Sequence, residues 1–207
     1  MTIFSPKHTS SLMLSSVMPH LRQIILWLVI AVAVLLGSFF GTLRVIDRFF
    51  PGVGYDVARF PRVQRGQSLD FQNNNRGALI DGWANSEPWG VWSEGDRAQL
   101  GFLLVSVLPE RTKLLIGCRA FITPANPEQR IEFWAQNIKL ADVTLRENIS
   151  TIAVPLGELR FRAGSPLIIE LRMPSARSPK QLALSQDPRK LAIGLERARF
   201  EEEGVSR

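Results

Sequence analysis

The sequence predicts an all-β fold, an antiparallel jelly-roll-like β-sandwich, preceded by a single N-terminal transmembrane helix. Residues 24–43 run without a charged side chain, which indicates the helix. From about residue 67 onward, short segments alternate apolar and polar side chains and are separated by Pro, Gly and Asn. This alternation is typical of a sandwich. No stretch after the apolar run shows a convincing helical stripe.

The apolar run is long enough for a membrane anchor. At about 1.5 Å per residue, a helix over 24–43 spans roughly 30 Å, the thickness of a bilayer's hydrocarbon core. A cleaved signal peptide is the alternative, but its apolar region is usually about 7–15 residues long. We therefore predict a cytoplasmic tail at 1–22, an anchor at 23–44 and a juxtamembrane linker at 45–66. Arginines on both sides of the anchor leave its orientation open.

The strands are expected in order along the rest of the chain. Pro109 ends the first long run, and "TPANP" and Asn137 supply turns after the next two. The predicted strands cover 98–108, 112–122, 130–136, 138–145, 150–156, 166–173 and 191–200. We predict a sandwich domain over 67–201 and a C-terminal tail at 202–207.

Charge and cysteine usage narrow the function classes. The net charge is +6, but the arginines are scattered and no zinc-finger or RNP motif appears, so we expect no nucleic-acid partner. The single cysteine, Cys118, cannot form an intrachain disulfide. It alternates with apolar neighbours in "LLIGCRAFI", which favours a buried core position over a reactive thiol.

The residue types that most enzymes need are missing after the anchor. The two histidines, His8 and His20, both precede it. The β domain therefore lacks the commonest general base and metal ligand, and we predict no catalytic residue, no metal and no cofactor. Two alternatives are weaker. One is a carboxylate-based hydrolase using Glu87, Glu94 and Asp96. The other is a calcium site formed by Asp81, Asn85, Glu87 and backbone carbonyls.

The segment "DGWANSEPWGVWSEG", 81–95, concentrates aromatic and hydrogen-bonding side chains. Indole faces stack on sugar rings and amide or carboxylate groups bind hydroxyls, so the glycan-binding candidates are Trp83, Asn85, Glu87, Trp89 and Trp92. The alternative is that the tryptophans plug the end of the sandwich. Because Trp89 and Trp92 are three residues apart, in a strand their rings would face opposite sides, one in the core and one exposed or under a loop.

A second segment, 178–200, precedes and includes the last predicted strand. Asp187 and Arg189 lie two residues apart in it, which favours a half-buried polar cluster over catalysis. We predict that Ser178, Pro179, Asp187 and Arg189 support the tryptophan segment, with Arg189 reaching a carboxylate such as Glu87.

With both segments in view, the chain resembles a small C-terminal β-sandwich domain of Gram-negative bacteria. That domain occurs in the phosphoglycerol transferases that modify periplasmic glucans and in some membrane glycosyltransferase-like proteins. The resemblance covers about 81–200, including "RAFITPAN" at 119–126. The matching positions are Gly82, Glu87, Trp89, Gly90, Trp92, Ser93, Gly95, Ser178, Pro179, Leu182, Ser185, Asp187, Arg189, Leu191, Ile193, Gly194 and Leu195. Ala183 and Ala192 depart from it, because glycine is expected there.

The resemblance implies an extracytoplasmic domain connected with glycan chemistry, without the metal-dependent transferase domain of the larger relatives. We therefore expect a single-pass protein of the bacterial inner membrane with a periplasmic C-terminal domain. Its expected role is a non-catalytic accessory module that binds a saccharide or docks onto a membrane glycosyl or phosphoglycerol transferase. The alternative is a structural subunit of a membrane complex with no glycan contact, which the Gly37/Gly41 spacing slightly favours.

Overall fold

The fold is described from a computed structural model, which covers residues 54–72 and 74–202 together with Val32 and Val34. The predicted anchor at 23–44 and the tail at 1–22 lie outside the described residues, apart from those two valines. Within the described ranges, no helix has both the length and the apolar character needed to span a bilayer.

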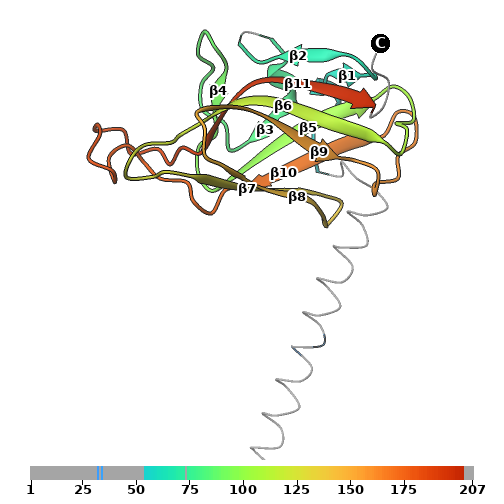
Figure 1. The fold of residues 1–207 in the computed structure, drawn as a ribbon. Coiled ribbons are helices and arrows are strands. Elements are labelled where there is room, and N and C mark those ends of the chain that lie inside the picture. The colour runs from blue at the N-terminus through green and yellow to red at the C-terminus, as the bar shows by residue number, and fades with distance from the viewer. Residues whose placement is uncertain (1–31, 33, 35–53, 73, 203–207) are drawn as a thin grey trace, which may run out of the picture. The chain divides into compact units, whose positions relative to one another are not determined.

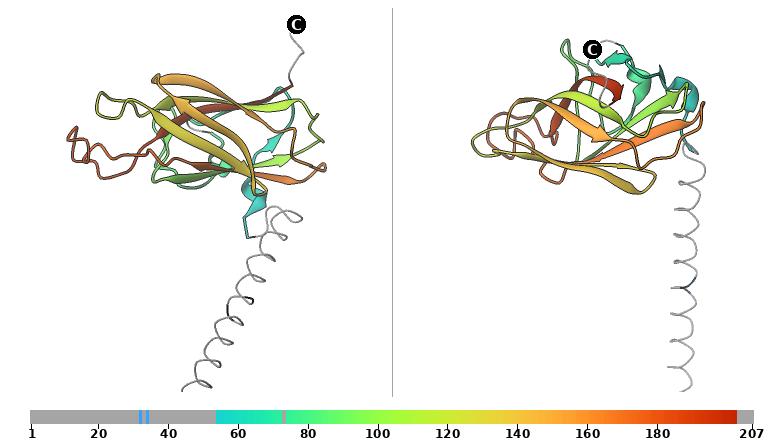
Figure 2. Two further views of the ribbon diagram at one scale, coloured as in Figure 1. Left: turned by 60° about the horizontal axis from the view of Figure 1, so that its bottom comes forward. Right: turned by 45° about the vertical axis from the view of Figure 1, so that its right-hand side comes forward.

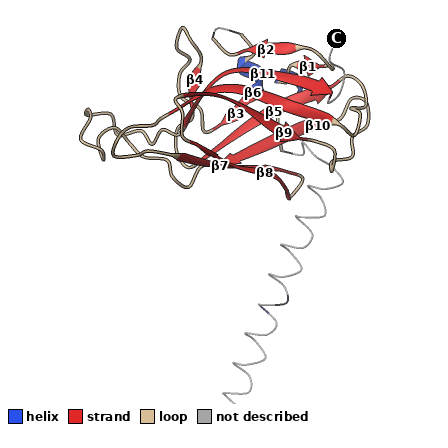
Figure 3. Cartoon of the chain, viewed as in Figure 1, coloured by secondary structure: helices blue, strands red, loops and turns tan. Residues whose placement is uncertain are grey.

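Strands make up nearly all of the regular structure between residues 54 and 202 (Figure 3). Two 3₁₀ turns are present, η1 at Val57–Arg59 and η2 at Arg76–Ala78. The strands are β1 Arg62–Val63, β2 Ser68–Asp70, β3 Leu79–Asp81, β4 Val91–Trp92, β5 Arg97–Leu104, β6 Thr112–Ala120, β7 Gln129–Ala135, β8 Ile138–Leu145, β9 Ile149–Pro155, β10 Pro166–Arg172 and β11 Ile193–Glu202. The all-β prediction is confirmed for the described part of the chain.

The strands form two sheets that face each other (Figure 1). One has the order β1-β5-β10-β7-β8, with β3 also paired to β5. The other has the order β2-β11-β6-β9, with β4 also paired to β11. Every pair is antiparallel except β1 with β5. Figure 2 shows the two layers edge-on, with the connection between β10 and β11 extending past the strand ends.

The core lies between the two sheets because alternate side chains of each strand point inward. In β10, Leu167, Ile169 and Leu171 are buried, whereas the residues between them are half-buried. Phe102 of β5 and Phe200 of β11 meet across the interface edge to face, with ring centroids 5.2 Å apart. Both rings are fully buried, so this contact joins the centres of the two sheets.

Part of the predicted linker belongs to the sandwich. The linker was expected to continue to residue 66, but β1 pairs with β5 and the buried side chain of Phe60 lies over Gly101 of β5. A Cβ on Gly101 would come within 2.5 Å of the Phe60 ring. The prediction failed here because "RFPRV" is too short to show alternation. Its contacts with β5 are visible only in the three-dimensional fold.

Candidate functional site

The tryptophan segment 81–95 forms a folded-back loop between β3 and the start of β5. The peptide groups of Glu87 and Gly90 bond to each other at 2.7 and 3.1 Å, which closes a tight reversal. Further along, the Ala84 N–H donates to the Trp92 carbonyl at 2.9 Å. Gly90 has φ +156, and a Cβ there would lie 2.3 Å from the Leu195 carbonyl oxygen. Glycine is therefore required where the reversal approaches β11.

Trp89 and Trp92 contact each other, which corrects the expectation that their rings face opposite sides. The ring centroids are 5.2 Å apart at an interplanar angle of 71°. Strand alternation does not apply here, because Trp89 lies in the reversal and only Trp92 lies in β4. Both rings are half-buried and lie over Gly194, whose missing side chain leaves the space they occupy.

Contacts surround the Trp89 ring. Its Nε1 donates to the Glu87 carboxylate at 2.6 Å. The Arg119 guanidinium lies 4.4 Å from the ring centroid and also pairs with Glu196 at 2.6 Å. This arrangement combines a cation–π contact with a charge-assisted hydrogen bond. Of the five candidates, Glu87 and Trp89 are therefore engaged mainly with their own neighbours.

Trp92 borders a hollow of about 340 Å³ at the end of the second sheet. Its walls are mostly apolar, with Arg119 and Asn148 as polar groups at the margin. Trp92 and Phe121 meet edge to face, with centroids 6.3 Å apart. Ile149 is 71% exposed beside them. We define these residues, Trp92, Arg119, Phe121, Asn148 and Ile149, as the Trp92 groove.

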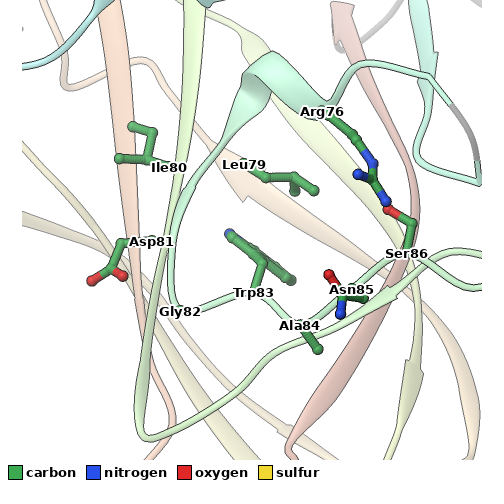
Figure 4. Close-up of a pocket in the computed structure, with 9 residues that line it drawn as sticks. All are labelled: Arg76, Leu79, Ile80, Asp81, Gly82, Trp83, Ala84, Asn85 and Ser86. Atoms are coloured by element: carbon green, nitrogen blue, oxygen red, sulfur yellow. The ribbon is translucent and has the colours of Figure 1, made fainter.

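Trp83 lies in a different hollow, of about 230 Å³, lined by Arg76 and residues 79–86 (Figure 4). Its Nε1 donates to the Gln99 carbonyl at 2.8 Å, which fixes the ring on β5. Asn85 lines this hollow as well and is exposed. The structure thus places Trp83 and Asn85 at one hollow and Trp92 at another. Trp89 packs against Trp92 and bonds to Glu87.

The predicted support residues build the connection between β10 and β11. Arg189 donates to Asp187 through Nη2 at 2.7 Å and through its backbone N–H at 2.9 Å. These bonds lower the pKa of Asp187. Ser178 is buried and its hydroxyl accepts from the Gln181 N–H at 3.1 Å. The Pro179 carbonyl accepts from the Leu184 N–H at 2.9 Å.

The expected contact from Arg189 to Glu87 is replaced by these bonds within the connection. Pairing with Asp187, two residues away, restricts fewer side-chain torsions than pairing with Glu87 on another loop, so it costs less conformational entropy. The charges of Glu94 and Glu87 are nevertheless close enough to contribute, after Asp187, to the raised pKa of Arg189. The connection contacts the tryptophan segment through its backbone, where the Gly95 N–H donates to the Lys190 carbonyl at 2.9 Å.

Ser93 links the tryptophan segment to β11 more directly. Its hydroxyl is fully buried and accepts from the backbone N–H groups of Ala192 and Ile193 at 3.3 and 3.1 Å. Its own N–H donates to the Ile193 carbonyl at 2.8 Å. One side chain thus satisfies two buried donors at the start of the last strand.

Titratable groups within the described ranges do not form a metal centre. No three His, Cys, Asp or Glu side chains gather there in a way that could hold a metal ion. Burial, with a smaller contribution from Glu196, raises the pKa of the Cys118 thiol to about 12. A thiol with that pKa is a poor nucleophile at neutral pH.

Arg119, Phe121, Asn148 and Ile149 were not among the predicted site residues. "RAFITPAN" was noted only as part of the resemblance, although an arginine on the outer face of a strand beside an aromatic residue was a usable signal. The contact between residues 119–122 and 148–149 follows from the pairing of β6 with β9. Pairing of this kind depends on the fold, so the sequence did not reveal the groove.

Comparison with known families places residues 67–202, about two thirds of the chain, in the domain of unknown function DUF7024. The chain belongs to the DUF7024 family. The DUF7024 region covers both sheets except for β1, which precedes it. A comparison with curated proteins finds no match.

Several solved structures share part of the fold of this DUF7024 protein. One is an acetyl xylan esterase, Est2A, from the rumen bacterium Butyrivibrio proteoclasticus, at 11% identity over 69% of this chain and 35% of that one, with a TM-score of 0.43. Another is a family two carbohydrate esterase from Clostridium thermocellum in complex with cellohexaose, at 11% identity over 65% and 32%, with a TM-score of 0.34. A third is a cycloisomaltooligosaccharide glucanotransferase from Paenibacillus sp., at 10% identity over 65% and 18%, with a TM-score of 0.30.

The chain spans about a third or less of the length of these three enzymes. At TM-scores below 0.5, the likeness carries no conclusion about activity. Any function has to be argued from the residues of this chain.

Proposed function

We propose that this DUF7024 protein is a non-catalytic, jelly-roll-like module that binds a glycan in the Trp92 groove. The observation that supports the proposal is an apolar hollow of about 340 Å³, walled by Trp92 and Phe121, with polar groups only at its margin. Sugar rings present apolar C–H faces and hydroxyl rims, and this combination of aromatic walls and a few polar groups suits both.

The polar margin of the groove has two kinds of group. Arg119 is held in place by Glu196 and by the Trp89 ring. Because its side chain is already ordered, it loses little further conformational entropy when a ligand binds. Asn148 is exposed, and its amide offers both a donor and an acceptor to hydroxyls. Ile149 extends the apolar surface beside Trp92.

A non-catalytic role is part of the proposal. Both histidines of the chain precede residue 24, and the one cysteine is buried with its pKa raised to about 12. Glu87, one of the three carboxylates considered for catalysis from the sequence, is bonded to the Trp89 indole. These features leave few groups for proton transfer or nucleophilic attack.

Glycan binding can be tested by calorimetry on the full-length chain in a polyoxyethylene detergent, whose headgroup is not a sugar. Periplasmic glucans and neutral gluco-oligosaccharides are the ligands. We expect saturable binding that weakens about tenfold or more, roughly 1.4 kcal/mol, in Trp92→Ala because the stacking surface is lost. Trp134→Ala is the matched control, since Trp134 is a half-buried tryptophan on β7 of the other sheet.

A second variant separates binding from folding. Asn148→Ala removes an exposed amide without removing core contacts, so it should weaken binding several-fold while leaving the unfolding midpoint unchanged. Absence of saturable heat across the glycan panel, or equal affinities for Trp92→Ala and the parent, contradicts the proposal. Co-purification with a membrane protein that persists in Trp92→Ala, together with no glycan binding, would favour the structural-subunit alternative.

We further propose that residues 23–44 anchor the module in the bacterial inner membrane with the sandwich in the periplasm. There it would act beside a membrane glycosyl or phosphoglycerol transferase. The support is the uncharged run at 24–43 and the resemblance described above. Alkaline phosphatase fused after Arg207 should be active in intact cells, and a fluorescent reporter that folds only in the cytoplasm should be dark. The opposite pair of results would reverse the orientation.

A further inference from the structure

The hollow beside Trp83 differs chemically from the Trp92 groove. Its lining is more polar than apolar and includes a cation, an amide and a hydroxyl, from Arg76, Asn85 and Ser86. In Figure 4 the Arg76 guanidinium and the Ser86 hydroxyl point toward each other, with the Asn85 amide on the same side of the hollow. The Asp81 carboxylate also lines the hollow but points away on the opposite side.

Arg76 is an exposed cation that no carboxylate within the described ranges pairs with. Other arginines of the sandwich, such as Arg119 and Arg189, form ion pairs. Arg76 begins the 3₁₀ turn η2, which places its side chain at the mouth of the hollow. Its planar guanidinium presents several N–H donors suited to the two or three oxygens of a carboxylate or phosphate.

Ser86 supplies an independent observation. Its hydroxyl oxygen is buried and has no hydrogen-bond partner among the described residues. An unsatisfied buried hydroxyl costs free energy, which a ligand oxygen at this position would recover. In contrast, the buried hydroxyl of Ser93 has two backbone donors.

Trp83 gives the hollow an apolar wall. Because its Nε1 bonds to the Gln99 carbonyl, the ring is held against β5. The ring and Leu79 line the hollow, and Figure 4 shows them between Asp81 on one side and Ser86 on the other. The volume of about 230 Å³ is below the roughly 300–1,000 Å³ of sites for drug-sized molecules. It suits a ligand of monosaccharide size.

We propose that the hollow between Arg76, Trp83 and Ser86 binds an anionic sugar, as a second site separate from the Trp92 groove. The sugar ring lies against the indole. Its carboxylate or phosphate accepts hydrogen bonds from the Arg76 guanidinium and the Ser86 hydroxyl, with the Asn85 amide beside them. The site favours a ligand with a negative charge, because no carboxylate among the described residues pairs with Arg76.

The test is calorimetry on the full-length chain in the same polyoxyethylene detergent, with glucuronate, glucose 6-phosphate, inorganic phosphate and glucose as probes. We expect saturable binding of glucuronate or glucose 6-phosphate, at least tenfold tighter than glucose. Arg76→Gln should lower that affinity tenfold or more. Arg111→Gln, which removes an exposed arginine outside the hollow, should not change it. Binding of only one of the two sugars identifies the carboxylate or the phosphate as the recognised group.

Ser86→Ala is a second variant of the same site, for use if Arg76→Gln folds poorly. It should weaken binding of the anionic sugar several-fold without lowering the unfolding midpoint, because the hydroxyl has no hydrogen-bond partner in the described part of the chain. Equal affinity for glucose and the charged sugars, no saturable binding, tighter binding of inorganic phosphate than of either sugar, or unchanged affinity in Arg76→Gln overturns the proposal. Trp92→Ala should leave this binding intact, so failure here and failure of the Trp92 groove are distinguishable.

Discussion

Gly194 decides whether the indoles of Trp89 and Trp92 can meet. A Cβ at this position would lie 2.3 Å from the Trp89 ring and 3.2 Å from the Trp92 ring. The first distance is shorter than real Cβ contacts and the second is tighter than most of them, so either the rings or β11 would have to move. A different property, the backbone conformation, is relevant at Ala183, where the resemblance expects glycine. Ala183 has φ 56, a conformation in which glycine has no steric cost.

Gly194→Ala should therefore lower the free energy of unfolding by about 1–3 kcal/mol, the usual cost of overpacking a filled site. Urea denaturation followed by tryptophan emission measures this directly. Thr151→Ala, an exposed position on β9 of the same sheet, is the control and should stay within about 0.5 kcal/mol of the parent. A Gly194→Ala protein with parental stability would show that the rings move aside freely.

At the scale of single elements, the start of β11 depends on the hydroxyl of Ser93. Ser93→Ala leaves the N–H groups of Ala192 and Ile193 without this acceptor in a buried position, which should cost about 1–3 kcal/mol. Ser86→Ala is a matched control, because it removes a buried hydroxyl oxygen that bonds to none of the residues the structure describes. Equal unfolding midpoints for the two variants in thermal denaturation would contradict this role.

The hairpin of β7 and β8 carries an ionic cluster on its outer face. Arg130 and Lys139 both bond to Asp142, at 2.7 and 2.6 Å, and both contact Glu132. The hydrogen bond from Arg130, followed by that from Lys139, holds the pKa of Asp142 well below its usual range. The hydrogen bond from the Trp134 indole is the largest cause that lowers the pKa of Glu132.

These lowered pKa values set the pH dependence of the hairpin's contribution. A carboxylate whose pKa is lower in the folded than in the unfolded protein stabilises the fold at pH values above its unfolded pKa, near 4. This contribution is lost as the pH falls through the pKa of the folded state. The difference in stability between the parent and Arg130→Gln should therefore be largest at pH 6–7 and shrink below pH 4. Urea denaturation at pH 7, 4 and 3 in low salt measures it. Because the groups are exposed, added salt should reduce the difference.

For the whole molecule, the segment before the family region completes the first sheet. The buried ring of Phe60 covers Gly101, and the backbone N–H of Leu103 donates to the Pro61 carbonyl at 3.0 Å. A sandwich that begins at residue 67 would lose both contacts. It would also lack β1, so the end of β5 that pairs with β1 would have no partner strand on that edge. The folded unit therefore extends beyond the DUF7024 match at 67–202.

Phe60→Ala should lower the free energy of unfolding by about 3–5 kcal/mol, as for other buried phenylalanines. Denaturation of the full-length chain, followed by circular dichroism, measures the change. Val57→Ala is the control, since Val57 is only half-buried in η1 and should cost less than Phe60. A cost below about 1 kcal/mol for Phe60→Ala would mean that the segment only rests on the sheet.

The sandwich strands were predicted well because alternation is local. The expected strands at 112–122, 130–136 and 166–173 correspond to β6, β7 and β10 within two residues at each end. The turn expected at Asn137 is present, with φ 49 at Gln136 and φ 62 at Asn137, the left-handed pair that suits a two-residue hairpin. Buried side chains on one face and turn residues between strands are properties of neighbouring positions, so they can be read along the chain.

The candidate site could be predicted only in part. The sequence identified the tryptophan segment, the second segment at 178–200 and the buried Cys118, since composition and spacing alone distinguish them. The tertiary structure decided that Trp83 and Trp92 line separate hollows and that Trp89 contacts Arg119. It also decided that residues 60–63 belong to the sandwich. The lining of the Trp83 hollow is local in sequence, but its place on the sheet depends on the bond from Trp83 to Gln99 of β5. The Trp92 groove, the Trp89–Arg119 contact and the pairing of residues 62–63 join segments tens of residues apart. Strand pairing and close packing select these contacts, so no local pattern in the chain specifies them.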